Sequence, residues 1–152
     1  MSCTPVPGLL EETMFLKLSE TVSVAPQITA ADVGAAKAAG FTAIINNRPD
    51  GEAPDQPPSE TIAAAAATEG LAYAYIPMSQ GGITPDMIEA VRKALEGQTT
   101  LMFCRSGTRS TMLWGLAEAS AGKNPEELAE AARAAGYDLS PIYGVMQQMA
   151  TR

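Results

Sequence analysis

Short apolar segments alternate with helical patterns along most of this chain, and this alternation restricts the fold more than any other feature. Runs at residues 41–46, 71–76 and 99–103 are rich in apolar and β-branched side chains and have the length of buried strands. Each is followed by a polar loop and then by a segment with helical signals. Strands that alternate with helices form βαβ units, which make the strands parallel and place helices on both faces of the sheet. The sequence therefore predicts an α/β domain with a mostly parallel sheet flanked by helices.

Capping signals set the limits of the expected helices. Thr29 with Asp32 resembles a capping box, and Thr84 stands directly before Pro85, as at many helix starts. Glycines follow the predicted helix ends. We expect helices over residues 29–40, 59–70, 84–97 and 108–121, further helices opening at residues 124 and 140, and two short strands at the sheet edge, residues 15–18 and 22–25.

The length of 152 residues suits one domain. Residues 1–13 contain prolines without periodicity and are predicted to be a flexible lead-in, and residues 14–152 are predicted to form the domain. No run approaches the roughly 18 apolar residues of a membrane span, and the N-terminus lacks the features of a signal peptide. We therefore expect a soluble, cytoplasmic protein with no membrane partner.

Charge and composition exclude several functions. The net charge of −7 leaves no basic surface for nucleic acid. The chain has no histidine, which excludes Ser-His and Cys-His catalysis and the common zinc sites. We expect neither metal nor cofactor. Two cysteines are too few for a disulfide framework, so Cys3 is most simply an exposed thiol, and a resolving partner for Cys104 is the less favoured interpretation.

The strand at residues 99–103 ends in Cys104, where a glycine-containing loop leads into a helix. Backbone N–H groups of such a loop and the helix N-terminus attract an anion, and the same field stabilises a thiolate. A buried, inert cysteine is the alternative, but the arginines and hydroxyls that follow are unusual for a core segment. We predict Cys104 as the nucleophile and Arg109 as its catalytic partner, with the anion held by Arg105, Ser106, Gly107, Thr108 and Ser110.

Two further loops are expected beside this one, because ligands of parallel sheets bind beyond the carboxyl ends of the strands. These are residues 47–52 and 78–82. Arg48 directly follows a strand and is predicted to help bind the substrate, the alternative being a solvated surface arginine. Candidate general acids are Asp50 and Glu52 and, less favoured, Asp86, whose position after Thr84 and Pro85 suits a charge in the first turn of a helix.

Residues 24–27, 46–52 and 104–110 resemble the phosphatase-like domain of the beta-lactamase hydrolase-like proteins, a likeness that extends over roughly residues 18–119. This resemblance implies the fold of cysteine-dependent dual-specificity phosphatases. It also implies one of two activities. Members of the family are labelled phosphatases, but members that are joined to persulfide-oxidising domains look like sulfurtransferases. A persulfide dioxygenase is the partner protein that the second activity implies.

Two departures from the tyrosine phosphatase pattern favour sulfur transfer. Arg109 lies one position closer to the cysteine than in those enzymes, and Phe103 replaces their histidine, so the loop is similar to that of single-domain rhodaneses. Residues 78–82 contain no aspartate to protonate a leaving group, and sulfite needs none. We predict a sulfurtransferase that moves sulfur from thiosulfate or glutathione persulfide through a Cys104 persulfide. One alternative is a protein tyrosine or dual-specificity-type phosphatase that acts on phosphotyrosine or a small anionic phosphate ester through a phosphocysteine at Cys104. The other is a non-catalytic anion-binding or redox-sensing module.

Overall fold

The computed structural model describes residues 15–79 and 82–151. The predicted lead-in and Cys3 lie outside the described residues. Within the described ranges, every helix is too short or too polar to cross a membrane.

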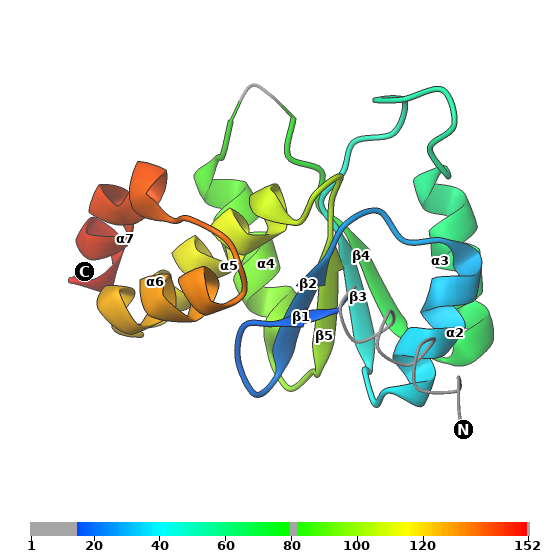
Figure 1. Cartoon of the computed structure of the whole chain (residues 1–152), viewed down its shortest axis with the longest axis horizontal. Coiled ribbons are helices and arrows are strands. Elements are labelled where there is room, and N and C mark those ends of the chain that lie inside the picture. The colour runs from blue at the N-terminus through cyan, green and yellow to red at the C-terminus, as the bar shows by residue number, and fades with distance from the viewer. Residues whose placement is uncertain (1–14, 80–81, 152) are drawn as a thin grey trace.

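A five-stranded sheet forms the centre of the molecule (Figure 1). Its strands, in the order β1-β2-β5-β3-β4, are β1 (Leu16–Lys17), β2 (Val22–Ala25), β5 (Thr100–Phe103), β3 (Ala43–Asn46) and β4 (Ala72–Tyr75). All neighbouring strands are parallel except the β1–β2 pair, which is antiparallel. The predicted mostly parallel sheet is confirmed. The prediction that both N-terminal strands lie at the edge is wrong for β2, because β2 hydrogen-bonds to β5 and lies inside the sheet.

Helices cover both faces of the sheet (Figure 1). One face carries α2 (Ala30–Ala38) and α3 (Ser59–Glu69), and the other carries α4 (Pro85–Leu95) and α5 (Thr108–Ser120), with α6 (Pro125–Ala134) and α7 (Tyr143–Ala150) packed on α5. The predicted capping box is present, since Thr29 and Asp32 exchange side chain to backbone hydrogen bonds. The helix predicted to open at Ser140 begins instead with a short 3-10 helix, Ser140–Ile142, where Asp138 accepts the Ser140 N–H and supports the tight turn.

The two faces of the sheet have separate cores, and β5 contributes to both. Leu101 and Phe103 pack with α2 and α3, whereas Met102 packs with α4 and α5. Each fully buried side chain of this size contributes roughly 1.5–3 kcal/mol. The apolar run that predicted this strand is thereby explained, and packing on both faces fixes the position of Cys104 at its carboxyl end.

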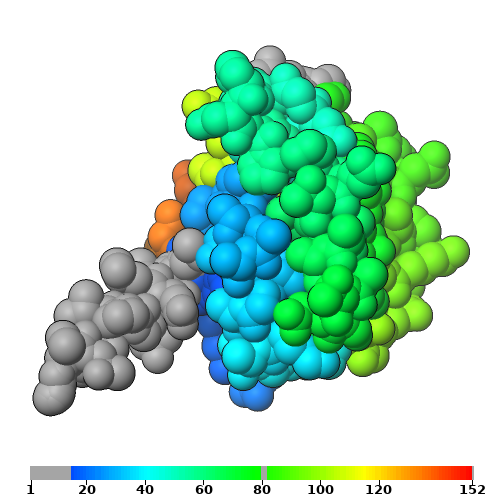
Figure 2. Space-filling model, turned by 90° about the vertical axis from the view of Figure 1, so that its right-hand side faces the viewer, coloured from blue at the N-terminus to red at the C-terminus, as the bar shows by residue number. Residues whose placement is uncertain are grey.

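The carboxyl ends of the parallel strands meet at one edge of the sheet, which is at the top of Figure 1. The connections that leave β3, β4 and β5 all start there. Figure 2 shows the connection after β3, drawn in teal, at the top of the face that carries α2 and α3. The three loops predicted to lie together therefore share one edge.

Candidate active site

Cys104 follows β5 directly, and its side chain is fully buried at the start of α5. The Gly107 N–H donates to Cys104 Sγ at 3.0 Å. Gly107 is the N-cap residue of α5 with φ of +94°, and no side chain caps this helix. The sulfur therefore accepts a backbone hydrogen bond beside the positive end of the helix dipole.

Arg109 lies in the first turn of α5, and residues of two neighbouring loops hold its side chain by hydrogen bonds. Its Nη1 donates to Glu52 Oε2 and to the Met78 carbonyl, and its Nη2 donates to Glu52 Oε1, each at 2.8 Å. A guanidinium has five N–H donors, so Nε and one Nη2 hydrogen form a second edge that these bonds do not use. The pKa of Arg109 is raised, first by its hydrogen bond with Glu52 and also by the charge of Cys104. Arg109 is therefore oriented by Glu52 and Met78 and lies close to the sulfur, as an oxyanion clamp requires.

Glu52 is the carboxylate of the site. It accepts both Arg109 bonds and a third from Arg48 Nε at 3.0 Å. These partners, Arg109 above all, lower the pKa of Glu52 to about 2 although desolvation acts in the opposite direction. Glu52 is thus ionised at neutral pH and, while it is paired, cannot serve as the proton donor that the sequence analysis considered.

Arg48 is buried behind Glu52 and is not a solvated surface side chain. Only 5% of the residue is exposed, and its Nη1 donates to Gln27 Oε1 at 3.0 Å while Nε donates to Glu52. It does not line the pocket in front of Arg109. Arg48 therefore helps to fix the position of Glu52.

The other predicted anion-binding residues of the loop after β5 are either exposed or buried. Arg105 is exposed at the mouth of a pocket of about 520 Å³, whose lining consists of Pro49, Glu52, Ser79, Arg105 and Arg109. Ser106 and Thr108 are exposed, and their hydroxyls hydrogen-bond to each other. Ser110 is fully buried and donates to Asn47 Oδ1 at 2.8 Å, so its hydroxyl is committed to the interior and not to the mouth of the loop.

The two remaining candidate acids lie outside the pocket that Glu52 and Arg109 line. Asp50 Oδ1 accepts the Ser59 N–H at 2.7 Å and so caps α3, which has no cap from its own N-cap residue. Asp86 is exposed in the first turn of α4, as the alternative interpretation of its position expected. Glu52 is therefore the one candidate acid in the lining.

Two residues of the site were missed by the sequence analysis. Fully buried Asn47 begins the loop after β3 and hydrogen-bonds to the segments around the other two loops, through Ile76, Met78, Phe103 and Ser110. An asparagine directly after an apolar strand was the available signal. Tyr137, on the connection after α6, donates from Oη to the Ser106 carbonyl at 2.9 Å. No local motif marks it, because its partner is 31 positions away.

Residues 14–122 of the chain match the family described as the phosphatase-like domain of the beta-lactamase hydrolase-like protein. The chain belongs to this family. Among curated proteins it is 42% identical over 104 residues to the beta-lactamase hydrolase-like protein of Xylella fastidiosa strain Temecula1, which covers 66% of this chain and 24% of that protein. The chain thus spans about a quarter of the length of this relative.

Solved structures support the same fold. A proposed phosphatase from Neisseria meningitidis is 29% identical, with a TM-score of 0.76, over 90% of this chain and 98% of that one. Tk-PTP in its active form is 13% identical with a TM-score of 0.70, over 91% of this chain and 97% of that one, a likeness that shows the fold alone. The resemblance and the cysteine phosphatase fold are confirmed. These names favour the phosphatase alternative over the sulfurtransferase that the sequence analysis preferred.

Within residues 15–79 and 82–151, no three His, Cys, Asp or Glu side chains come together as a metal-binding group.

Proposed function

We propose that the chain is a thiolate-dependent phosphatase that hydrolyses small anionic phosphate esters through a phosphocysteine at Cys104. The observation that carries this proposal is the arrangement of Cys104 Sγ, the Gly107 N–H and the clamped Arg109 around one end of α5. This arrangement supplies a nucleophile, a backbone donor and a fixed guanidinium for the transferring phosphoryl group.

In the first step the Cys104 thiolate attacks phosphorus, an S–P bond forms, and the bond from phosphorus to the leaving oxygen breaks. The second edge of Arg109 binds the equatorial oxygens, and Arg105 at the mouth attracts the anionic substrate. In the second step water attacks the phosphocysteine, which releases phosphate and the thiolate. Neither step requires Glu52 to leave Arg109, because the pair uses the other edge of the guanidinium.

The supply of a proton to the leaving group restricts the substrate. Among the described residues, Glu52 is the one carboxyl group in the pocket lining, and it is ionised. An alkoxide is a poor leaving group without an acid, whereas a phenolate or a phosphate leaves as a stable anion. We therefore propose aryl phosphates or phosphoanhydrides, rather than alkyl phosphates, as the substrate class.

Sulfur transfer is the second candidate, and the spacing from Cys104 to Arg109 favours it. The shorter loop resembles that of rhodaneses, and a persulfide intermediate needs no general acid. In that reaction Cys104 would attack the outer sulfur of thiosulfate, and sulfite would leave with the electron pair of the broken S–S bond. The persulfide dioxygenase predicted as a partner belongs to this candidate.

Leaving-group dependence tests the main proposal. The rate of phosphate release should rise steeply from alkyl phosphates to 4-nitrophenyl phosphate, vanadate should inhibit it, and Cys104→Ser should abolish it. Formation of thiocyanate from thiosulfate and cyanide, measured on the same preparation, is the competing activity. Efficient thiocyanate formation without turnover of any aryl phosphate would replace the main proposal with the second candidate.

A further inference from the structure

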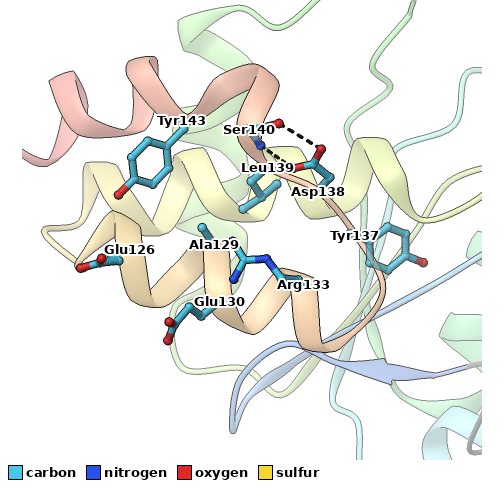
Figure 3. Close-up of a pocket in the computed structure, with 9 residues that line it drawn as sticks. All are labelled: Glu126, Ala129, Glu130, Arg133, Tyr137, Asp138, Leu139, Ser140 and Tyr143. Atoms are coloured by element: carbon cyan, nitrogen blue, oxygen red, sulfur yellow. Dashed lines mark hydrogen bonds between the residues drawn. The ribbon is translucent and has the colours of Figure 1, made fainter.

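Tyr137 belongs to a segment far from the active-site loop in sequence, yet its hydroxyl contacts that loop. It follows α6, and Figure 3 shows its ring at one end of a group of side chains, with the hydroxyl pointing away from Arg133 and Tyr143. The hydroxyl donates to the Ser106 carbonyl at 2.9 Å. Tyr137 thus connects the C-terminal helices to the loop that carries Cys104.

The contact with Ser106 acts on one particular peptide group. The Ser106 carbonyl and the Gly107 N–H belong to the same planar peptide unit, so fixing one fixes the direction of the other. That N–H donates to Cys104 Sγ at 3.0 Å. One peptide plane therefore receives a hydrogen bond from Tyr137 on one side and gives one to the sulfur on the other.

The ring of Tyr137 also lies directly against Gly107. A Cβ at this glycine would overlap Tyr137 Oη and would come within 2.9 Å of Cζ. Gly107 has a positive φ, and glycine has more backbone freedom there than other residues. The Ser106–Gly107 peptide could therefore rotate if nothing outside the loop contacted it. The ring against Gly107 and the hydroxyl on the Ser106 carbonyl both oppose such a rotation.

We propose that Tyr137 is a positioning residue that holds the Ser106–Gly107 peptide with its N–H aimed at Cys104 and strengthens that bond by polarising the peptide. Hydrogen bonds in series reinforce each other by roughly 10–30% per bond. Burial raises the pKa of Tyr137, and the charge of Cys104 raises it further, so the hydroxyl keeps its proton and remains a donor. The inference rests on Cys104 being the reactive group of the proposed function, but not on which anion it attacks.

Tyr137→Phe tests this role because it removes the hydroxyl and keeps the ring over Gly107. The rate of Cys104 alkylation by iodoacetamide, followed against pH, reports the thiolate without any substrate. Other charged or titratable groups near the sulfur, Arg109 above all, remain in place in this variant. We expect the midpoint of the pH profile to move up and the rate at pH 7 to fall about threefold, since a charge-assisted hydrogen bond is weakened.

Tyr143→Phe is the matched control. Tyr143 lines the same pocket as Tyr137, and its hydroxyl makes no hydrogen bond to the loop among the described residues. Its alkylation profile should equal that of the wild type. A second measurement is the amide proton shift of Gly107 by NMR, which should move upfield in Tyr137→Phe and return when 4-aminophenylalanine, which retains a donor, occupies position 137.

The outcomes separate this inference from the proposed function. An unchanged profile and an unchanged Gly107 shift in Tyr137→Phe, with a reactive wild-type thiol, overturn the role of Tyr137 alone. A wild-type profile whose midpoint is no lower than that of a free cysteine overturns the proposed function as well. Should Tyr137→Phe fail to fold, the 4-aminophenylalanine variant compared with the wild type decides, because loss of reactivity despite a retained donor contradicts the inference.

Discussion

We expect Gly107→Ala to lower the free energy of unfolding more than Gly122→Ala does, although the two glycines have similar backbone conformations. Gly122, just after α5, has φ of +99°, close to the +94° of Gly107, and a Cβ there would meet nothing within 4 Å. Both substitutions place an alanine in the left-handed region, which costs roughly 1–2 kcal/mol. That cost is common to the two variants and cancels in their comparison.

The contact with Tyr137 adds a further cost at Gly107 alone. The new methyl group overlaps Tyr137 Oη, so the ring must move and its bond to the Ser106 carbonyl is lost. A hydrogen bond of this kind contributes about 1 kcal/mol. We therefore expect Gly107→Ala to lower the free energy of unfolding by roughly 2–3 kcal/mol. The difference of about 1 kcal/mol from Gly122→Ala corresponds, in a domain of this size, to a melting temperature about 2–4 °C lower for Gly107→Ala.

Urea denaturation of both glycine variants, each alone and combined with Tyr137→Ala, measures the additional free-energy cost that Tyr137 causes at Gly107. The double-mutant cycle predicts that the excess cost of Gly107→Ala disappears when the ring is absent, whereas the cost of Gly122→Ala is unaffected. Equal destabilisation of the two glycine variants in the wild-type background would refute the claim that Tyr137 packs against the active-site loop.

Three other variants test the remaining contacts of the site. Glu52→Gln should reduce the free energy of unfolding at pH 7 by about 1 kcal/mol after solvent screening. Because the pKa of Glu52 is lowered from 4.5 to about 2, this stabilisation exists above pH 4.5 and is lost as the pH falls through 2, so urea curves of wild type and variant should converge over that interval. Asp50→Ala should cost about 1 kcal/mol through the lost cap of α3 and leave turnover of 4-nitrophenyl phosphate unchanged; lower turnover would return Asp50 to the site. Arg48→Lys should lose stability in thermal melts, since one ammonium group cannot replace both the Nε bond to Glu52 and the Nη1 bond to Gln27.

Features encoded by neighbouring residues were predictable from the sequence. The capping box of Thr29 and Asp32 and the start of α5 after Gly107 depend on residues a few positions apart. The same holds for Cys104, where an apolar strand, a glycine and the N-terminus of a helix follow one another directly. These local patterns gave the elements, the fold class and the position of the candidate nucleophile.

Features that depend on distant segments were not predictable in this way. The place of β2 inside the sheet depends on its pairing with β5, which no local pattern reveals. Arg48 was expected at the substrate, but the loop after β3 folds back so that Glu52 lies between it and Arg109. Tyr137 reaches the loop only because α6 packs on α5. The preference for sulfur transfer rested on the loop after β5 and on the absence of an aspartate from residues 78–82, whereas the family description and the solved structure from Neisseria meningitidis carry phosphatase names.

Trapping the phosphocysteine tests whether Cys104 is the nucleophile that receives the phosphoryl group. Wild-type protein is mixed with excess 4-nitrophenyl phosphate, quenched within one turnover, digested and analysed by mass spectrometry, with Cys104→Ser as the control. We expect an adduct with the mass of one phosphoryl group on the peptide that contains Cys104, and none on that peptide in the control. An unmodified Cys104 under these conditions, together with the gain of one sulfur atom after incubation with thiosulfate, would contradict it.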